Sequence, residues 1–487
     1  MEGECRWQNN CIRGSCRICG NEGGLRCSNC RMQFYCSKDH QLTDWPDHRE
    51  ICIAWKIQES PELGRYLIAS KDLYPGDTII AEDPIIWGPA LHTDEIICIG
   101  CGYKNPTSTC PTCRWPSCKS TCEGLKNVNG HGIECKLLAK AKMLPRCEII
   151  LPLRILLLRP FDQKRWKTLI KLQSHEDSRG SGTEAYEEVK KLADQMSPLL
   201  SLDPESKKIL PKVCGIIDVN ALETNPPEGT VALYKTACLL EHSCVANTKH
   251  SFNLEINGKP SIKVEAATSV KKGDHLSINY THALWSTRAR RDHLYATKYF
   301  LCDCKRCADP TELGSHLGTL KCSCENGWVL PKDPLNQDTD WSCDKCLCVL
   351  SSAEVLEITY KLEQEVEDAL AIASKEVLGN ILTRLELLLH PGHQHCISIA
   401  HSLIQLLSPE DPRKSELCKR IINTTSIIDP HGVRLGLYTA VALRELATCP
   451  GENKTDLLVK AIRLLYNEPA NSPGQKLSSL MEQQLIS

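Results

Sequence analysis

The sequence predicts an α+β protein of several domains, in which strand-rich and metal-binding segments precede an all-helical C-terminal part. The chain has 487 residues, more than one hydrophobic core usually supports. Most of its 30 cysteines stand in blocks of regular spacing. Beyond residue 350 cysteine becomes rare, and Leu/Ile-rich helical stretches alternate with Pro-Gly and Asp-Pro turns. We therefore expect bound metal to stabilise the cysteine-rich segments and helix packing to stabilise the part beyond residue 350.

Two blocks of cysteine and histidine repeat one spacing. The first block contains Cys16, Cys19, Cys27, Cys30, Cys36, His40, His48 and Cys52. The second contains Cys98, Cys101, Cys110, Cys113, Cys118, Cys122, His131 and Cys135. The offset is 82 residues at the first ligand and 83 at the last, and the one change of ligand type pairs His40 with Cys122. Because thiolate and imidazole both bind zinc tetrahedrally, each block predicts two zinc ions, with scattered free thiols as the alternative.

Two further cysteine clusters lie downstream. Three ligands, Cys302, Cys304 and Cys307, need a fourth from elsewhere in the chain. The second cluster is a complete four-thiolate set formed by Cys322, Cys324, Cys343 and Cys346. We interpret it as another zinc site, with free surface thiols as the alternative.

The chain begins with a polar segment that lacks the apolar core of a secretory signal. We therefore expect a reducing compartment, cytoplasmic and nuclear, where disulfides are rare and metal is the main explanation for the cysteines. The longest apolar run, 149–158, contains Pro152 and Arg154 and is too short to cross a bilayer. It predicts a buried helix, and no membrane attachment is expected.

Charge is balanced, with 58 Lys and Arg against 60 Asp and Glu. This balance excludes a global basic footprint for nucleic acid or anionic lipid. Basic residues of the first block, such as Arg26 and Arg31, are matched by acidic ones such as Asp44 and Asp47. Since no basic stripe emerges, direct DNA binding is disfavoured.

Strand and helix patterns alternate between the cysteine blocks. Short strand-like runs flank Pro75-Gly76 within 64–87, which predicts a hairpin or meander. Residues 136–212 are predicted to be largely helical, with a polar, Gly-containing loop at 174–182 and an amphipathic helix from Glu184 to Met196.

Further on, two strands between Thr248 and Thr268 surround Asn257-Gly258, a strong hairpin signal. A last strand is predicted from His275 to Asn279. Beyond residue 350 we expect five or six helices packed as antiparallel pairs, without a strict repeat period.

Three short segments are weak signals singly but become informative through their order along the chain. They are LEHSCVAN (240–247), GDHLSINY (273–280) and CDCKRC (302–307). Together with Gly64-Arg65 and PGDTIIAEDP (75–84), they make residues 60–348 similar to a SET domain split by a MYND zinc finger. This is the arrangement of the SMYD family of SET- and MYND-domain protein-lysine methyltransferases. The extra N-terminal finger and the spelling EHSC most resemble the arthropod SmydA branch.

The resemblance implies a β-rich SET domain split by a MYND finger, an extra N-terminal MYND finger, a zinc-bound post-SET region and an all-helical C-terminal domain. The predicted segments are a first MYND finger (1–57), the N-terminal part of the SET domain (58–97), the inserted finger (98–135), a helical SET insertion (136–212), the SET core (213–300), the post-SET region (301–349) and a TPR-like helical domain (350–487).

The resemblance also implies how the zinc ligands are grouped. In the first finger, Cys16, Cys19, Cys36 and His40 share one ion, and Cys27, Cys30, His48 and Cys52 share the other. In the second finger the sets are Cys98, Cys101, Cys118, Cys122 and Cys110, Cys113, His131, Cys135. Cys244 completes the set of Cys302, Cys304 and Cys307.

The same resemblance implies a cofactor, S-adenosylmethionine, and a catalytic tyrosine. The cofactor-binding residues carried over are Arg65, Tyr66, Asn220, Glu241, His242, Lys298 and Tyr299. Tyr280 is the candidate catalytic residue, whose hydroxyl orients the substrate amine. Because a lysine amine is only about 0.1% neutral near pH 7.4, the site must favour its deprotonated form. The implied substrate is a lysine of a histone or non-histone protein, and the fingers are expected to bind proline-rich peptides of partners, the protein itself being a monomer.

Three positions depart from the family pattern and leave an alternative open. Glu241 replaces an asparagine, Tyr66 stands where glycine is common, and Lys298 stands where a second tyrosine of the lysine channel is expected. The alternative is a catalytically impaired, zinc-dependent adaptor or transcriptional co-regulator that binds partners through its MYND fingers.

Overall fold

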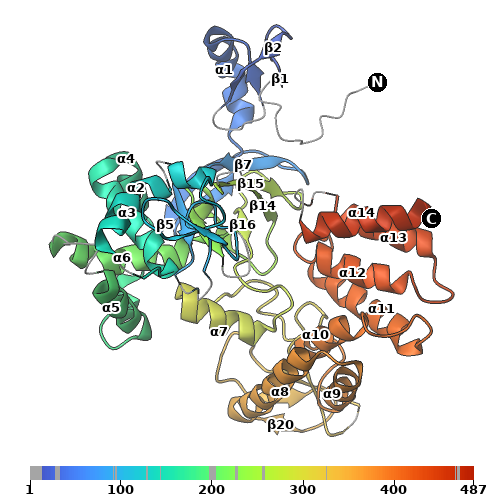
Figure 1. Ribbon diagram of the computed structural model, residues 1–487. Helices are drawn as coiled ribbons and strands as arrows, with labels where there is room; N and C mark the ends of the chain where they lie inside the picture. Colours follow the sequence, from blue (N-terminus) through green and yellow to red (C-terminus); the bar gives the residue numbers. More distant parts are fainter. Residues whose placement is uncertain are drawn as a thin grey trace. The chain divides into compact units, whose positions relative to one another are not determined.

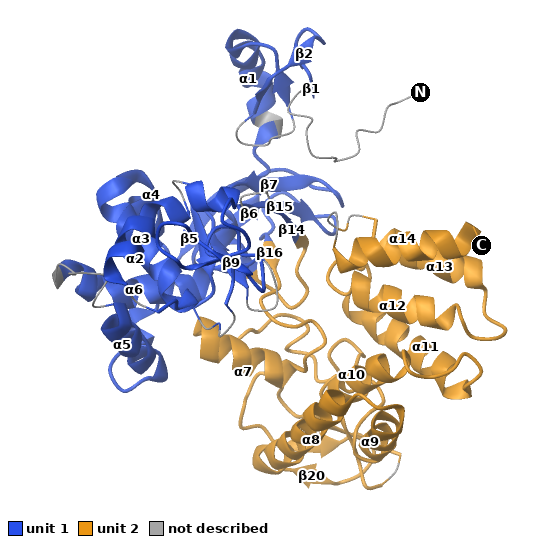
Figure 2. Cartoon of the chain, viewed as in Figure 1, with its two compact units in different colours: residues 1–241, 250–276 blue, residues 242–249, 277–487 orange. Residues whose placement is uncertain are grey.

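A computed structural model describes residues 14–27, 33–91, 93, 96–127, 130–142, 144–196, 204–224, 229–254, 258–324, 326–466, 468 and 472–486. The chain divides into two compact units, which Figure 2 colours separately. Unit 1 comprises residues 1–241 and 250–276, and unit 2 comprises residues 242–249 and 277–487. Across the ranges just given, no helix combines the length and the apolar character that a bilayer crossing needs.

Unit 1 begins with the first cysteine block, which folds into two small strand pairs and a helix (Figure 1). The pairs are β1 (Gly14–Ser15) with β2 (Glu22–Gly23), and β3 (Leu25–Arg26) with β4 (Phe34–Tyr35). Helix α1 (Lys38–Cys52) follows, and the Ser37 side chain caps it by accepting a hydrogen bond from the His40 amide. The buried Tyr35 hydroxyl donates to Asp44 on this helix at 2.6 Å, which ties the helix to the strands.

Apart from the strand pairs of the two cysteine blocks, the described strands of unit 1 form three small antiparallel sheets. Strand β5 (Trp55–Ser60) pairs with β6 (Gly64–Ala69). Strand β7 (Thr78–Glu82) is an edge strand of the sheet ordered β14-β15-β7. Strand β8 (Ile86–Pro89) is an edge strand of the sheet ordered β11-β12-β8. The partners are β11 (Leu222–Glu223), β12 (Thr230–Leu233), β14 (Thr248–Leu254) and β15 (Pro260–Ala266). The hairpin of β14 and β15 was predicted, although Asn257 of its turn lies outside the described residues.

The prediction of a hairpin or meander at Pro75-Gly76 was wrong about the pairing. A turn is present, and Gly76 adopts the left-handed φ of 93° that favours glycine. However, β6 and β7 on either side of it enter different sheets. The Gly76 amide donates to Ala266 at the end of β15, so the turn is held by a strand almost 200 residues away. Turn chemistry shows where a strand ends, whereas its partner depends on contacts distant in sequence.

The remaining part of unit 1 is the second cysteine block and a group of helices. The block contains the pair β9 (Ser108–Thr109) and β10 (Pro116–Ser117) and ends in α2 (His131–Ala141). Helices α3 (Ile150–Phe161), α4 (Gln163–Leu169), α5 (Glu184–Met196) and α6 (Pro204–Asn220) follow. Residues 150–158 of α3 are all buried, as its apolar run predicted, and α5 has the predicted bounds.

Unit 2 contains the second half of the SET-like segment and the helical C-terminal part. The boundary between the two units lies within strand β13 (Glu241–His242). In unit 2, strand β16 (Ser277–Ile278) is followed by helix α7 (Thr287–Lys298). The last predicted strand, 275–279, is therefore shorter than expected. A four-stranded antiparallel sheet follows, ordered β17 (Leu320–Lys321), β18 (Trp328–Pro331), β19 (Trp341–Cys343) and β20 (Val349–Leu350).

Helices complete unit 2, and each packs against the next along the chain. They are α8 (Ser352–Ile372), α9 (Lys375–Leu388), α10 (Gln394–Leu403), α11 (Pro412–Ile428), α12 (Gly436–Leu446), α13 (Lys454–Leu464) and α14 (Pro473–Ile486). Beyond residue 350 the described part of the chain thus contains seven helices, where five or six were predicted. One break carries no Pro or Gly: α8 ends at Ala373 in the left-handed conformation, and Ser374 caps α9.

Candidate functional site

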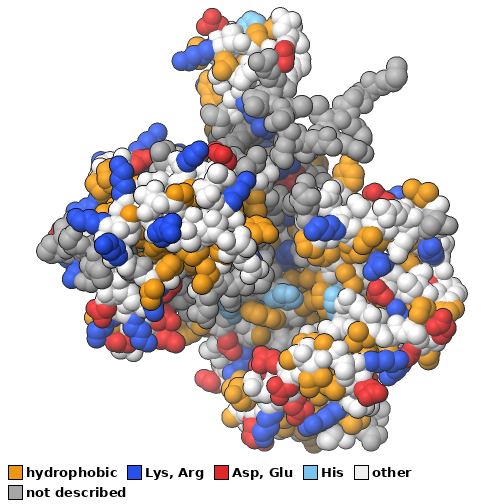
Figure 3. Space-filling view, in the orientation of Figure 1, with side chains coloured by type: hydrophobic (Ala, Val, Ile, Leu, Met, Phe, Trp, Pro, Cys, Tyr) orange, Lys and Arg blue, Asp and Glu red, His pale blue; other side chains and the backbone are white. Residues whose placement is uncertain are grey.

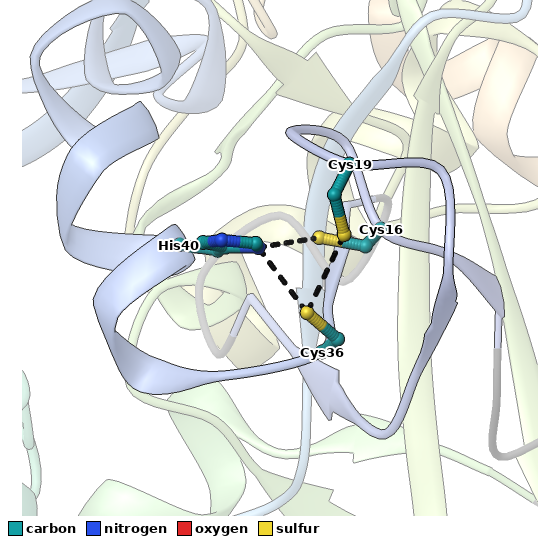
Figure 4. Close-up of side chains that lie close together, drawn as sticks. All are labelled: Cys16, Cys19, Cys36 and His40. Atoms are coloured by element: carbon teal, nitrogen blue, oxygen red, sulfur yellow. Dashed lines mark hydrogen bonds between the residues drawn. The ribbon is translucent and has the colours of Figure 1, made fainter.

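The first finger gathers four of its predicted ligands at one point in unit 1. The donor atoms of Cys16, Cys19, Cys36 and His40 all lie within 4.8 Å of one another, and Figure 4 shows the side chains converging. His40 uses Nδ1, which lies 3.2 Å from Cys36 Sγ and 3.5 Å from Cys16 Sγ. The other predicted set brings Cys27 Sγ to 3.6 Å from Cys52 Sγ and 3.3 Å from His48 Nε2, while Cys30 lies outside the described residues.

These separations fit tetrahedral zinc. A Zn–S bond of about 2.3 Å gives an S···S edge of about 3.8 Å in a tetrahedron. The sulfur pairs Cys101–Cys118 and Cys110–Cys135 are 3.7 and 3.8 Å apart. A disulfide would need about 2.05 Å, and none joins the described cysteines. The donor sets therefore have the chemistry and the spacing that zinc requires.

In the second finger the two predicted sets each lie together: Cys98, Cys101, Cys118, Cys122 and Cys110, Cys113, His131, Cys135. Helix α2 places His131 and Cys135 one turn apart, as the HxxxC spacing predicted. His131 directs Nε2 at Cys110 Sγ (3.3 Å) and Nδ1 at Glu134 Oε1 (3.2 Å). Glu134 Oε1 also accepts a hydrogen bond from Arg154 Nη2 at 2.8 Å, and both side chains are fully buried.

Arg154 and Glu134 were not among the predicted site residues. Arg154 also donates to the carbonyl oxygens of Trp87 and Ile99, both at 2.9 Å, and so joins α3 to β8 and to the finger. The Arg154 charge offsets the effect of burial and keeps the pKa of the Glu134 carboxyl below its usual value. The one signal in the sequence was Arg154 itself, a charged residue inside the apolar run.

In unit 2, Cys244 joins Cys302, Cys304 and Cys307 and closes the three-ligand set. Its Sγ lies 3.6 Å from Cys307 Sγ and 4.0 Å from Cys302 Sγ. The buried Arg290 donates to Cys244 Sγ at 3.1 Å and to Glu312 at 2.7 Å. Hydrogen bonds within the set, from Cys302 first, hold the pKa of the Cys244 thiol far below its usual value. Arg290 places positive charge beside the sulfurs of Cys244 and Cys307, a role that the sequence did not reveal.

The strands of the four-stranded sheet bring the last set together: Cys322, Cys324, Cys343 and Cys346. Cys322 Sγ lies 3.6 Å from Cys346 Sγ, and Cys324 Sγ lies 3.8 Å from Cys343 Sγ. Backbone amides also donate to the sulfurs: Lys345 to Cys343 at 3.3 Å and Cys348 to Cys346 at 3.4 Å. Amide donors stabilise thiolates, so this set also fits zinc.

Four predicted cofactor residues lie in unit 1. The Arg65 guanidinium donates to the Lys171 carbonyl at 2.7 Å and lines a cavity of about 690 Å³ together with residues 170–178 and Lys212. Asn220 donates to the Gln173 carbonyl, also at 2.7 Å, and so connects α6 to the same segment. The cavity contains cationic and anionic side chains, which suits a ligand that carries both charges.

The other two predicted cofactor residues of unit 1, Tyr66 and Glu241, both contact His275. Tyr66 stacks on the His275 ring with centroids 4.6 Å apart, and His275 Nδ1 lies 2.8 Å from Glu241 Oε1. The buried Glu241 Oε2 has no hydrogen-bond partner among the described residues. Burial raises the pKa of the Glu241 carboxyl despite the histidine. An unsatisfied acceptor of this kind fits the ammonium of an amino-acid moiety. His275 was missed because nothing in its segment distinguishes it.

The remaining predicted residues lie in unit 2. The Tyr280 amide donates to His242 Nδ1 at 3.0 Å, and the two rings have centroids 5.3 Å apart. The Lys298 ammonium, at the end of α7, lies 6.0 Å from the centre of the Tyr280 ring. Tyr299 follows in the left-handed conformation with φ of 62°, which ends the helix. The structure thus groups Tyr280 with His242 and Lys298.

Comparison with known proteins gives the class. The MYND finger model matches residues 16–52. SET domain-containing protein SmydA-8, isoform B, of Drosophila melanogaster is 32% identical over 322 residues, 62% of this chain and 68% of that protein. Histone-lysine N-methyltransferase ASHR1 of Arabidopsis thaliana is 24% identical over 354 residues, 66% of this chain and 69% of that protein. A solved SET domain of LSMT, bound to lysine and AdoHcy, matches with a TM-score of 0.28 and 13% identity over 91% of both chains, too weak to define a shared arrangement.

The MYND finger and the similarity to a SET-domain relative define a zinc-binding protein with SET and MYND domains. The chain belongs to the SMYD family of SET- and MYND-domain protein-lysine methyltransferases and is similar to its SmydA members. At the level of the family, the predicted fold class, the enzyme class and the cofactor zinc are confirmed.

Proposed function

We propose that this protein is a protein-lysine N-methyltransferase that transfers methyl from S-adenosylmethionine to a lysine of a histone or non-histone protein. The observation that carries the proposal is the grouping in unit 2: Tyr280 is held by His242 beside the four-cysteine set that contains Cys244. A fixed tyrosine at a rigid, metal-stabilised point is suited to orient an amine.

For methyl transfer the protein must bind a lysine side chain, exclude water from its amine and orient the amine toward the methyl group. S-adenosylmethionine, when bound, supplies an electrophilic methyl group. The Tyr280 hydroxyl orients the neutral amine, and exclusion of water disfavours the ammonium form. The residues proposed to hold the cofactor are Arg65, Tyr66, Asn220, Glu241, His242, Lys298 and Tyr299. The six Cys and Cys/His sets, including the one that contains Cys30, are proposed to hold structural zinc.

The partners are proposed from the family. The MYND fingers bind proline-rich peptides, and the protein acts as a monomer in the cytoplasm and nucleus. The seven predicted segments from 1–57 to 350–487 are its proposed domains. DNA binding stays disfavoured: Figure 3 shows Lys and Arg interspersed with Asp and Glu on the face that it draws.

A second candidate function is an adaptor that keeps the zinc sites and has lost catalysis. Two observations favour it. Lys298 places a cation 6.0 Å from the Tyr280 ring, close to where a substrate ammonium would arrive. Glu241 places a carboxyl where the family has an amide, and it would repel the carboxylate of the cofactor.

Two measurements on the full chain separate the candidates. S-adenosylmethionine should raise the Tm of the protein through binding linkage, and radiolabelled methyl should pass to a mixture of lysine-rich proteins. Tyr280→Phe should lower the transfer rate by about 10²-fold. Tyr295→Phe, on the exposed face of α7, is the matched control and should keep the rate. If the cofactor gives neither stabilisation nor transfer while zinc content is intact, the adaptor is the correct assignment.

A further inference from the structure

The imidazole of His242 lies between Tyr280 and a zinc-ligand sulfur. Its Nδ1 accepts the hydrogen bond from the Tyr280 amide at 3.0 Å, and its Nε2 lies 3.3 Å from Cys244 Sγ. All three residues belong to unit 2. One ring therefore connects the backbone of the candidate catalytic tyrosine to the Cys244 metal set.

The hydrogen-bond roles fix the tautomer of this ring. A backbone N–H is a donor only, so Nδ1 must present its lone pair to Tyr280. The single proton of the neutral imidazole is then on Nε2, where it faces Cys244 Sγ. A zinc-bound thiolate accepts such a proton, which makes both contacts favourable at once.

The Cys244 end of this connection is rigid. Cys244 is fully buried, and Arg290 donates to its sulfur at 3.1 Å. The Arg434 guanidinium, from the segment before α12, donates to the Cys244 carbonyl oxygen at 2.9 Å. Asp429 Oδ2 accepts from the Arg434 amide at 2.7 Å, so the helical region of unit 2 holds the cysteine from a further side.

We infer that His242 is a positioning residue: it transmits the geometry of the Cys244 zinc centre to Tyr280. It does so through two hydrogen bonds, and no proton or electron is transferred. The inference rests on the proposed function, in which Tyr280 orients the substrate amine. It adds that metal in this set acts on turnover through the direction of Tyr280 as well as through stability.

Two variants separate the two hydrogen bonds. In His242→Asn the side-chain oxygen takes the place of Nδ1, so the acceptor for Tyr280 is kept and the donor to Cys244 is lost. In His242→Gln the amide nitrogen takes the place of Nε2, so the donor is kept and the acceptor is lost. The matched control is His293→Gln on α7, whose ring packs against Trp285 and makes neither contact.

The test combines kinetics with spectroscopy of the metal and of the ring. Both His242 variants keep the backbone through which this residue is proposed to contact the cofactor, so they should change the affinity for S-adenosylhomocysteine less than about twofold. They should lower kcat about tenfold, because a misdirected tyrosine affects the transition state. In protein loaded with ¹¹³Cd, one four-thiolate signal should move in His242→Asn and stay in place in His242→Gln. The ¹⁵N shifts of the wild-type imidazole should report the Nε2–H tautomer.

The result that overturns the inference differs from one that overturns the function. An Nδ1–H tautomer, an unchanged ¹¹³Cd spectrum in His242→Asn, or kcat within twofold of wild type in both variants would reject the connection. A wild-type protein without methyl transfer would reject the proposed function, while the tautomer and the ¹¹³Cd signals would still decide whether His242 bridges Tyr280 and Cys244.

Discussion

Lys298 lies near the candidate catalytic tyrosine. Its ammonium lies 6.0 Å from the Tyr280 ring, and α7 holds it there one residue before the chain turns at Tyr299. Two cations near one another disfavour each other, so a substrate lysine that approaches Tyr280 arrives against this charge.

Removal of the Lys298 charge should therefore raise methyl transfer. At saturating S-adenosylmethionine, where a weaker hold on the cofactor does not limit the rate, we expect Lys298→Met and Lys298→Tyr to increase kcat/KM for the protein substrate about fivefold. Lys298→Arg should stay close to wild type, because the charge is the cause. The measurement is the initial rate of radiolabel transfer at pH 7.5. Equal rates in all four proteins would show that Lys298 does not oppose the substrate.

Arg154 and Glu134 form an ion pair next to the second finger. They are fully buried, and the carboxylate orients His131, a predicted ligand. Arg154→Met should destabilise unit 1 by about 3–5 kcal/mol, because it leaves a buried carboxylate without its partner. Chelator-induced zinc release from the second finger should also become faster.

The double variant Arg154→Met with Glu134→Gln tests the cause. Removal of the second charge should recover a large part of the lost stability in urea unfolding, since the pair and not the packing is broken. If the double variant is as unstable as the single one, the loss comes from the hydrogen bonds to Trp87 and Ile99 instead.

At the scale of elements, the sequence predicts what depends on neighbours along the chain. The spacing Cys-x2-Cys and the helical spacing of His131 and Cys135 constrain ligand geometry locally, so the donors could be found without a structure. Partners that act across the fold could not. Arg290, 46 residues from Cys244, and His275, 34 residues from Glu241, have no local pattern. The end of α8 at Ala373 was also missed, because no Pro or Gly separates α8 from α9 in the sequence.

The four-stranded sheet of residues 320–350 should depend on its own zinc ion. Its strands are only two to four residues long, and although Leu320, Val329 and Trp341 join the hydrophobic core of unit 2, metal binding adds to the folding free energy of the sheet. The double substitution Cys343→Ser with Cys346→Ser should reduce the zinc content from about six to about five per chain. Plasma emission spectrometry on the purified protein gives the count, and Cys348→Ser, beside the set, is the control that should keep six. A loss of two or more ions in the Cys343 and Cys346 variant would mean that the sheet supports a further site.

At the scale of the whole molecule, buried histidines make unit 2 sensitive to acid. Burial lowers the pKa of His390, His395 and His401 to about 4 each, and it lowers the pKa of His393 well below its usual value. His316 and His390 stack at 4.3 Å, so protonation of both would also place two charges in contact. The folded unit holds these rings neutral.

This arrangement sets the sign of the pH dependence. In the unfolded chain the histidines titrate near 6.5, so their contribution to stability is fully present above that pH. As the pH falls from about 6.5 to about 4, the unfolded state binds protons that the folded state excludes, and unit 2 should lose about 2–3 kcal/mol per histidine. Urea unfolding followed by circular dichroism at pH 7.5, 5.5 and 4.5 measures the loss. His401→Phe, which can keep the stack on Tyr438, should reduce the loss by one histidine's share. An unchanged slope in that variant would show that His401 is protonated in the folded protein.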